Sequence, residues 1–198
     1  MNFTSPSTMT IVGVTNVGKS YFMRKLIEEN AFDVAPKKIY WFYGIWQDSF
    51  EEMDNVEFFK GLPETFDTYF NGEPILIVID DLQDVVTKSN EVENLFCRGM
   101  HHGNATVCYL TQNLFYQGKN ARNIALNSHY IVLFKNPRGK TQVQTLANQT
   151  GMRHLVTAYE DAMKEKYGYL VLDLCPHSRD EFRLRTHVLP GEDPIIYS

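Results

Sequence analysis

The chain has 198 residues, of which 43% are hydrophobic and 22% charged, and its formal net charge is −5. These values are typical of a globular protein and exclude a collagen-like repeat, a coiled coil and a disordered chain. No run approaches the roughly 18 to 20 consecutive apolar residues that cross a bilayer, and residues 1–10 lack the pattern of a secretory signal, so we expect no contact with a membrane.

Short apolar, β-branched runs alternate with amphipathic stretches along most of the chain. This alternation predicts an α/β fold in which helices cover both faces of a mainly parallel central sheet, as in a three-layer sandwich. The length suits one such domain over residues 1–198. The expected strands cover residues 9–12, 38–42, 75–79, 106–110 and 130–134, and the expected helices cover residues 19–29, 89–100, 139–149 and 153–164.

The pattern changes near the C-terminus. Residues 167–174 and 181–188 are predicted to form a β-hairpin, because the turn-forming sequence Cys-Pro-His-Ser-Arg-Asp separates them at residues 175–180. Arg183 and Arg185 would then lie on one face of the second strand, since side chains two residues apart in a strand point the same way. We interpret that face as a subunit contact.

The strongest motif follows the first predicted strand. Residues 13–20, Gly-Val-Thr-Asn-Val-Gly-Lys-Ser, match G-x-x-x-x-G-K-[ST] between a strand and a helix. Gly13 and Gly18 permit backbone angles that turn successive N–H groups toward phosphate oxygens, and the helix adds its positive N-terminal end. Lys19 is expected to reach the β and γ phosphates, and Ser20 to offer a hydroxyl to Mg²⁺. The predicted nucleotide-binding residues are Gly13, Val14, Thr15, Asn16, Val17, Gly18, Lys19, Ser20 and Tyr21.

Two carboxylates follow the apolar strand at residues 75–79. A buried parallel strand that ends in acids is typical of a strand that leads into a site. We expect Asp80 to hold Mg²⁺ and Asp81 to act as the general base that deprotonates the attacking water. Two alternatives stay open: Asp81 caps the next segment through its side chain, or Asp84 takes one of these roles.

A further strand, residues 106–110, ends in Thr111, Gln112 and Asn113. Polar groups therefore emerge again at a carboxyl end, where ligands of open α/β sheets bind. The neutral amide of Gln112 can donate to the terminal phosphate and accept from the attacking water, so we expect it in the catalytic site. A turn-forming polar cluster without a catalytic role is the alternative.

An aromatic run occupies the second strand and the residues after it: Tyr40, Trp41, Phe42, Tyr43 and Trp46. Packing in the core is the expectation for these rings, and stacking on an adenine or another base is the alternative.

Charge is distributed unevenly. Residues 1–93 hold 16 acids against 7 Lys or Arg, residues 94–159 hold seven Lys or Arg and no acid, and residues 160–198 hold 8 acids and 5 Lys or Arg. An acid-free stretch of 66 residues can present one face to a polyanion, so the acidic total does not exclude DNA. The DNA-binding candidates, expected in loops that line a pore, are Lys119, Lys135, Arg138 and Lys140, with Arg122. Solvated surface side chains are the alternative.

Taken together, the phosphate loop, Asp80 with Asp81, and Thr111 with Gln112 resemble the FtsK/HerA superfamily of ring-forming DNA-pumping ATPases. Further segments are similar to the genome-packaging ATPases of Maverick/Polinton-type viruses, including adintoviruses. Those segments are residues 101–115, 126–130, 133–138, 167–170 and 184–186. The resemblance covers nearly the whole chain.

This resemblance implies a motor that uses ATP and Mg²⁺ to translocate double-stranded DNA into a preformed capsid. The implied partners are DNA without sequence preference, capsid or portal components, and further copies of the chain in a ring of five or six. The implied location is the nucleus or cytoplasm of an infected host cell, at assembling virions. The second acid is glutamate in many FtsK/HerA enzymes and is Asp81 here, one methylene shorter, which leaves its distance from the water open. Compared with two-domain terminases, the chain has no acid cluster beyond residue 160, so we expect no nuclease domain.

Ring ATPases of this kind complete each site with an arginine from the neighbouring subunit, worth roughly 10³ to 10⁵ in rate. The arginine that precedes the strand ending at Thr111 and Gln112 is Arg98, our first candidate for this trans finger. Arg122, which follows that strand, is the rival. Either can instead be a plain surface arginine.

Two other functions are compatible with the same loop. A small-molecule kinase would share the loop and the size, and would need a lid with paired arginines and an acceptor pocket. A nucleotide-gated capsid assembly protein would bind ATP without hydrolysing it.

Overall fold

The computed structural model of the protein describes residues 2–115 and 119–198, with their side chains except those of residues 98–103 and 119. A nine-stranded sheet forms its centre, in the order β3-β2-β4-β5-β1-β6-β7-β8-β9. Its strands are β1 (Thr8–Val12), β2 (Lys38–Tyr43), β3 (Glu57–Lys60), β4 (Ile75–Asp80), β5 (Ala105–Thr111), β6 (Tyr130–Phe134), β7 (Tyr169–Asp173), β8 (Leu184–Thr186) and β9 (Ile195–Tyr197). Strands β1 to β6 are parallel, and β7, β8 and β9 are each antiparallel to their neighbours.

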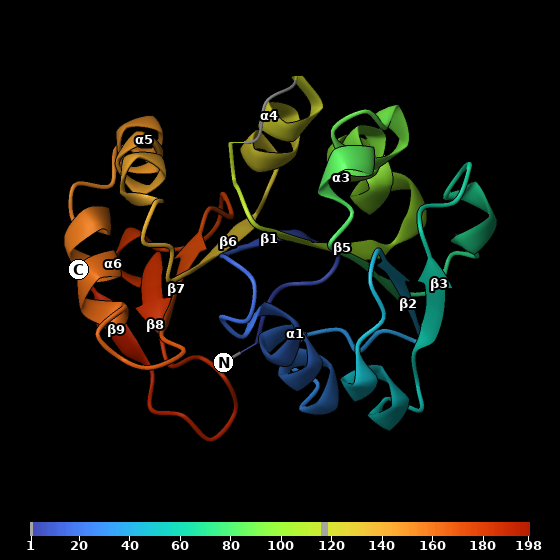
Figure 1. Ribbon diagram of the computed structural model, residues 1–198, viewed down its shortest axis with the longest axis horizontal. Coiled ribbons are helices and arrows are strands. Elements are labelled where there is room, and N and C mark those ends of the chain that lie inside the picture. Colours follow the sequence, from blue (N-terminus) through green and yellow to red (C-terminus); the bar gives the residue numbers. More distant parts are fainter. Residues whose placement is uncertain (1, 116–118) are drawn as a thin grey trace.

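Helices cover both faces of the sheet, as predicted (Figure 1). They are α1 (Lys19–Glu28), α2 (Gln83–Val86), α3 (Asn90–Gly103), α4 (Lys119–Leu126), α5 (Lys140–Thr150) and α6 (Leu155–Ala162), with short 3₁₀ turns η1 (Asp48–Glu52), η2 (Asp67–Tyr69) and η3 (Asp180–Phe182). Helix α1 lies on one face, and α3, α4 and α5 lie on the other. Among the described residues, no helix combines the length and the apolar character that crossing a bilayer requires.

The side-chain period of the strands divides the core between the two faces. On β4 all six residues are buried, with Leu76 and Val78 packed in the cluster that includes α1. Ile75, Ile77 and Ile79 pack on the opposite face, in the cluster that includes α3. This strand is apolar without interruption because it is covered on both faces.

The strand order brings the ends of three strands together. β5 lies between β1 and β4, so the segments that follow β1, β5 and β4 emerge side by side at one edge of the sheet. Ligands of open parallel sheets bind at this carboxyl edge. The fold therefore places the phosphate loop, Gln112 and the two acids in one neighbourhood.

Five predicted strands and four predicted helices are confirmed, with ends that shift by a few residues. Two helices and two strands escaped prediction: α2, α4, β3 and β9. β3 and β9 are strands of four and three residues at the sheet edges, too short for a periodic pattern. The helices α2 and α4 have four and eight residues, too few for their helical period to be recognised in the sequence.

The C-terminal hairpin is confirmed with a shorter second strand. β7 pairs with β8 antiparallel, but η3 and its C-cap Arg183 occupy residues expected in that strand. Arg185 is buried, and its Nη2 lies 2.7 Å from Oδ2 of Asp173. Asp173 Oδ1 also accepts hydrogen bonds from the Ser178 hydroxyl and the Cys175 amide. The subunit contact proposed for Arg185 is therefore wrong, because its charge is used within the chain.

Replacing Arg185 by methionine is expected to lower the free energy of unfolding by about 3 kcal/mol, because the Asp173 carboxylate stays buried without its partner. Urea denaturation of Arg185→Met against wild type measures the difference. Arg179→Met, which removes an exposed arginine nearby, should change stability by no more than about 0.5 kcal/mol. Equal stability of the two variants would contradict a structural role for the buried pair.

Candidate functional site

The phosphate loop has the backbone that its glycines predicted. Gly18, the N-cap of α1, has φ 106°, a value that side-chain-bearing residues rarely adopt. A Cβ on Gly13 would lie 2.6 Å from Cβ of Phe134, so only glycine fits there. The loop thus reverses sharply after β1 and starts α1 at Lys19, which directs the positive end of the helix at the cavity beside it.

Lys19 lies over this loop. Its Nζ donates to the carbonyl oxygens of Gly13 at 2.8 Å and Val14 at 3.0 Å. Burial lowers the pKa of Lys19, and the negative charges of Asp80 and Asp81 partly oppose that shift. The ammonium is therefore held at the mouth of the loop, on the side of the two acids, where it can neutralise a bound anion.

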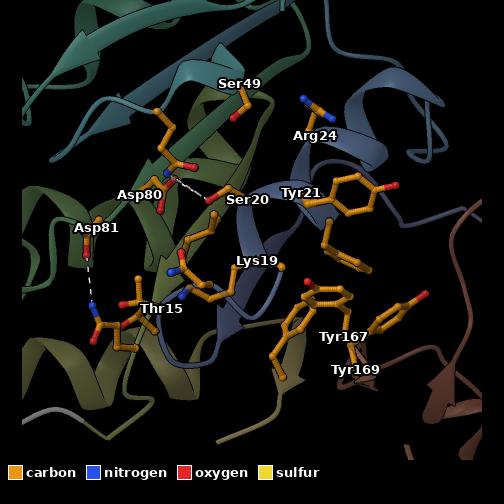
Figure 2. A pocket seen from close by; sticks show the side chains of 18 of the residues that line it. Thr15, Lys19, Ser20, Tyr21, Arg24, Ser49, Asp80, Asp81, Tyr167 and Tyr169 are labelled. Atoms are coloured by element: carbon orange, nitrogen blue, oxygen red, sulfur yellow. Dashed lines mark hydrogen bonds between the residues drawn. The ribbon is translucent and has the colours of Figure 1, made fainter. Parts of the chain in front are cut away.

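Ser20 and Asp80 lie next to each other in the wall of the cavity (Figure 2). The Ser20 hydroxyl donates to Oδ2 of Asp80 at 3.1 Å. Asp80 is buried, and burial raises its pKa to about 6, against hydrogen bonds from Ser20 and Gln47 and the charge of Lys19, which lower it. A hydroxyl and a carboxylate side by side are oxygen ligands suited to Mg²⁺.

Ser20 and Asp80 fit a magnesium ion that shares its shell with phosphate oxygens and water. The described part of the chain contains no group of three or more His, Cys, Asp or Glu that would hold a metal ion by itself. Mg²⁺ is commonly held by one or two protein oxygens, with the rest supplied by water and substrate phosphates. Metal and nucleotide would therefore bind together.

Gln47 completes this arrangement and was missed by the sequence analysis. Its Nε2 donates to Oδ2 of Asp80 at 3.1 Å and to Oγ of Ser20 at 3.3 Å. Gly44 brings the segment after β2 close to the acids: its amide donates to the Asp80 carbonyl at 3.0 Å, and a Cβ there would lie 2.3 Å from the Asp81 carbonyl oxygen. One signal was available, because Gln47 follows the carboxyl end of a strand as Asp80 does.

Asp81 faces away from Asp80. Its φ of 54° turns the chain sharply after β4, so that Asp80 is buried and Asp81 is exposed. Oδ1 of Asp81 accepts a hydrogen bond from Nε2 of Gln112 at 3.5 Å. The capping alternative is wrong, since the N-cap of α2 is Leu82. Asp84 lies within α2 and is not among the residues that line the cavity.

Gln112 is held by a second glutamine. Oε1 of Gln83, the first residue of α2, accepts hydrogen bonds from the Thr111 hydroxyl at 2.8 Å and from the backbone N–H of Gln112 at 3.2 Å. The end of β5 is therefore tied to α2, and the Gln112 side chain is directed toward Asp81. The predicted proximity of Asp81 and Gln112 is present in the structure, while their catalytic roles stay a prediction.

These residues line a cavity of about 930 Å³. Figure 2 shows Asp80 and Asp81 on one side of Lys19, and Tyr21, Tyr167 and Tyr169 on the other. The cavity thus has an acidic end and an aromatic end with the phosphate loop between them.

Four of the basic candidates, Arg122, Lys135, Arg138 and Lys140, are not among the residues that line this cavity. Arg98 belongs to α3 and Lys119 begins α4. The side chains of both residues lie outside the described part of the structure. Arg122 is exposed on α4 and Lys140 begins α5, so the expectation that loops carry them is wrong. Two more candidates, Lys135 and Arg138, are exposed in the segment between β6 and α5. Nζ of Lys140 lies 3.4 Å from Oε1 of Glu160, a surface ion pair of small energetic weight.

The prediction of core packing is confirmed for the aromatic residues Tyr40, Trp41 and Phe42 on β2 and is wrong for Trp46, which is 45% exposed. Tyr40, Trp41 and Phe42 are buried, on alternating faces of the sheet. Trp46 packs on Tyr43 and Phe50, each with ring centroids 5.4 to 5.8 Å from a neighbour in this group. These rings support the segment that carries Gln47.

No protein-family model matches the chain, and no curated protein matches its sequence. Solved structures do match. The DNA-packaging ATPase B204 from Sulfolobus turreted icosahedral virus superposes with a TM-score of 0.52 at 14% identity, over 100% of this chain and 98% of that one. The genome-packaging NTPase B204 from Sulfolobus turreted icosahedral virus 2, in complex with ATP-γS, gives 0.54 at 11% identity, over 97% of both chains.

The chain has the fold of a P-loop NTPase. At these identities the likeness shows the fold and not the activity. The B204 structures include complexes with two ATP analogues, ATP-γS and AMPPCP.

The burial of Asp80 gives a test by pH. Between about pH 4 and pH 6 the folded protein keeps a proton on Asp80 that the unfolded chain has released, so stability falls as pH rises through this window. Asp80→Asn removes this penalty and is expected to stabilise the metal-free protein at pH 8 by about 2 to 3 kcal/mol, with no difference near pH 4.

Urea unfolding in the presence of a chelator measures both values. Asp54→Asn, the same change at an exposed position, should alter stability by no more than about 0.5 kcal/mol at either pH. An Asp80→Asn variant less stable than wild type at pH 8 would contradict the raised pKa.

Proposed function

We propose that this chain is the ATP-hydrolysing motor subunit that translocates double-stranded viral DNA into a capsid. The observation that carries the proposal is the convergence of three strand ends on one cavity, with Lys19 and Ser20 facing Asp80 and with Gln112 bonded to Asp81. The fold shared with two viral packaging NTPases, over nearly the full length of both chains, supports this choice among the functions that a phosphate loop serves.

In this proposal the nucleotide lies with its terminal phosphate at the acidic end of the cavity. Amides of the phosphate loop and Lys19 hold the phosphates, and the γ-phosphate points toward Asp80 and Asp81. Ser20 and Asp80 would hold Mg²⁺, which would neutralise charge on the phosphates. Asp81 accepts a proton from water as the water oxygen attacks the γ-phosphorus, and the bond to the bridging oxygen breaks with its electron pair leaving on ADP. Gln112 donates through Nε2 to Asp81, which leaves Oε1 to accept from the same water.

DNA binding rests on the acid-free part of the chain. Lys135 and Arg138 are exposed after β6, near the edge of the sheet where the phosphate loop lies, and Arg122 is exposed on α4. Cations of this kind bind phosphates without reading bases, as packaging of a whole genome requires. Further copies of the chain in a ring and components of the capsid or portal are the proposed protein partners.

Replacing Asp81 by asparagine is expected to leave ATP binding within about threefold of wild type and to lower phosphate release at least about 100-fold, because only the proton acceptor is lost. Binding of a fluorescent ATP analogue and phosphate release, each with and without duplex DNA, provide the two readouts. Asp84→Asn, three residues on and outside the cavity, should retain full activity.

The same assay separates the alternatives. A packaging motor releases phosphate faster with duplex DNA, whereas a small-molecule kinase is indifferent to DNA. A nucleotide-gated assembly protein binds ATP and releases no phosphate even as wild type. Full activity of Asp81→Asn would overturn the assignment of the base.

A finger supplied by a neighbouring subunit predicts specific activity that rises steeply with protein concentration. Arg98→Ala is expected to lower phosphate release about 10³-fold without weakening nucleotide binding. If Arg98→Ala retains full activity, Arg122 becomes the candidate, and Arg122→Ala is expected to show this loss. Arg153→Ala, at an exposed position of the same acid-free stretch, is the control. Full activity in both the Arg98 and the Arg122 variants would remove both from the role.

A further inference from the structure

The aromatic end of the cavity has features that phosphate binding does not explain. Tyr167 and Tyr21 line the cavity, yet 61% and 55% of their surfaces are exposed. Tyrosine is usually more deeply buried, and exposed aromatic rings that face a cavity are typical of ligand contacts.

A tight turn after α6 holds Tyr167 in place. Tyr167 has φ 64°, an uncommon value for a bulky residue. A Cβ on the next residue, Gly168, would lie 2.0 Å from the carbonyl oxygen of Ala162, so the chain must pass close to the end of the helix. Glu165 is tied to His187 by a contact of 3.0 Å, and His187 also has a left-handed backbone, with φ 55°. Strained residues of this kind persist where surrounding contacts fix them, and they gather at ligand sites.

This turn places the Tyr167 ring against the phosphate loop. Its Cδ1 lies 3.8 Å from the position that a Cβ on Gly18 would occupy. Tyr21 follows Ser20 directly in the first turn of α1, so both rings flank the loop on the side away from Asp80 and Asp81 (Figure 2).

We infer that Tyr167 stacks on the purine base of the bound nucleoside triphosphate, with Tyr21 flanking the same space. The inference rests on the proposed function, which sets the γ-phosphate at the acidic end. A triphosphate held by the loop with that end at Asp81 must extend its ribose and base in the opposite direction, toward the two tyrosines.

Three polar side chains on this wall, those of Thr186, Glu192 and His187, are engaged within the chain. The Thr186 hydroxyl donates to the Tyr169 carbonyl at 2.6 Å, and Glu192 accepts from the Tyr169 hydroxyl and from the Leu189 amide. His187 contacts Glu165. Stacking uses the face of the base and not its edge, and it discriminates little between adenine and guanine because both present the same kind of π-face.

Tyr167→Asn tests this contact, because asparagine tolerates a left-handed backbone and removes the ring without adding strain. Calorimetric titration with ATP, GTP and tripolyphosphate, each with Mg²⁺, measures affinity with and without a base. We expect ATP and GTP to bind about 10-fold more weakly to Tyr167→Asn, and tripolyphosphate to bind within about twofold of wild type.

Two further variants control the experiment. Tyr167→Phe keeps the ring and should bind all three ligands as wild type does. Leu126→Ala removes an equally exposed apolar side chain outside the cavity and should also match wild type.

Three results would overturn the inference: unchanged ATP affinity in Tyr167→Asn, an equal loss for ATP and tripolyphosphate, or a wild-type preference for ATP over GTP above about 100-fold. Failure of the proposed function is a different result, in which wild type itself binds neither ATP nor tripolyphosphate.

Discussion

The hydrogen bond between Ser20 and Asp80 depends on the topology of the whole sheet. Ser20 starts the helix after β1, Asp80 ends β4, and the two strands are separated by β5. Their side chains come within 3.1 Å only because both strands end at the same edge and turn toward the gap above β5. Gln47 reaches the same carboxylate from the segment after β2, so the ends of three parallel strands, β1, β2 and β4, meet at one buried carboxylate. The apolar packing on both faces of the sheet therefore fixes the relative positions of Ser20, Gln47 and Asp80.

That charge is maintained at a cost to stability. Asp80 is nearly excluded from water, and its raised pKa reports the free energy that its ionised form lacks in the absence of a cation. Sites that bind a divalent cation tolerate such a penalty because the cation compensates it. The two hydrogen bonds to Oδ2 keep the group oriented until then. The raised pKa of Asp80 and the arrangement of oxygen atoms that a magnesium ion would require both follow from the burial of this carboxyl group.

The sequence predicted what local patterns encode. The phosphate loop and Asp80 were found because a motif of eight contiguous residues and an apolar strand carry their own context. Gln47 and Tyr167 were not assigned, since each reaches the cavity through a turn whose direction depends on distant packing: Gly44 against the Asp81 carbonyl, and Gly168 against the Ala162 carbonyl. Arg185 was misassigned for the same reason, because its partner Asp173 lies across the hairpin and not on the same strand. Short edge strands and two short helices escaped because periodicity needs length.

The two hydrogen bonds of the Gln83 side chain connect the end of β5 to the helices that cover one face of the sheet. The side-chain oxygen Oε1 of Gln83 accepts hydrogen bonds from the Thr111 hydroxyl and from the backbone N–H of Gln112. The side chain of Gln112 in turn donates to Asp81. α2 leads directly into α3, which packs against α4 on the outer layer. Because Gln83 belongs to α2, the placement of this outer helical layer and the orientation of Gln112 toward Asp81 depend on the same hydrogen bonds.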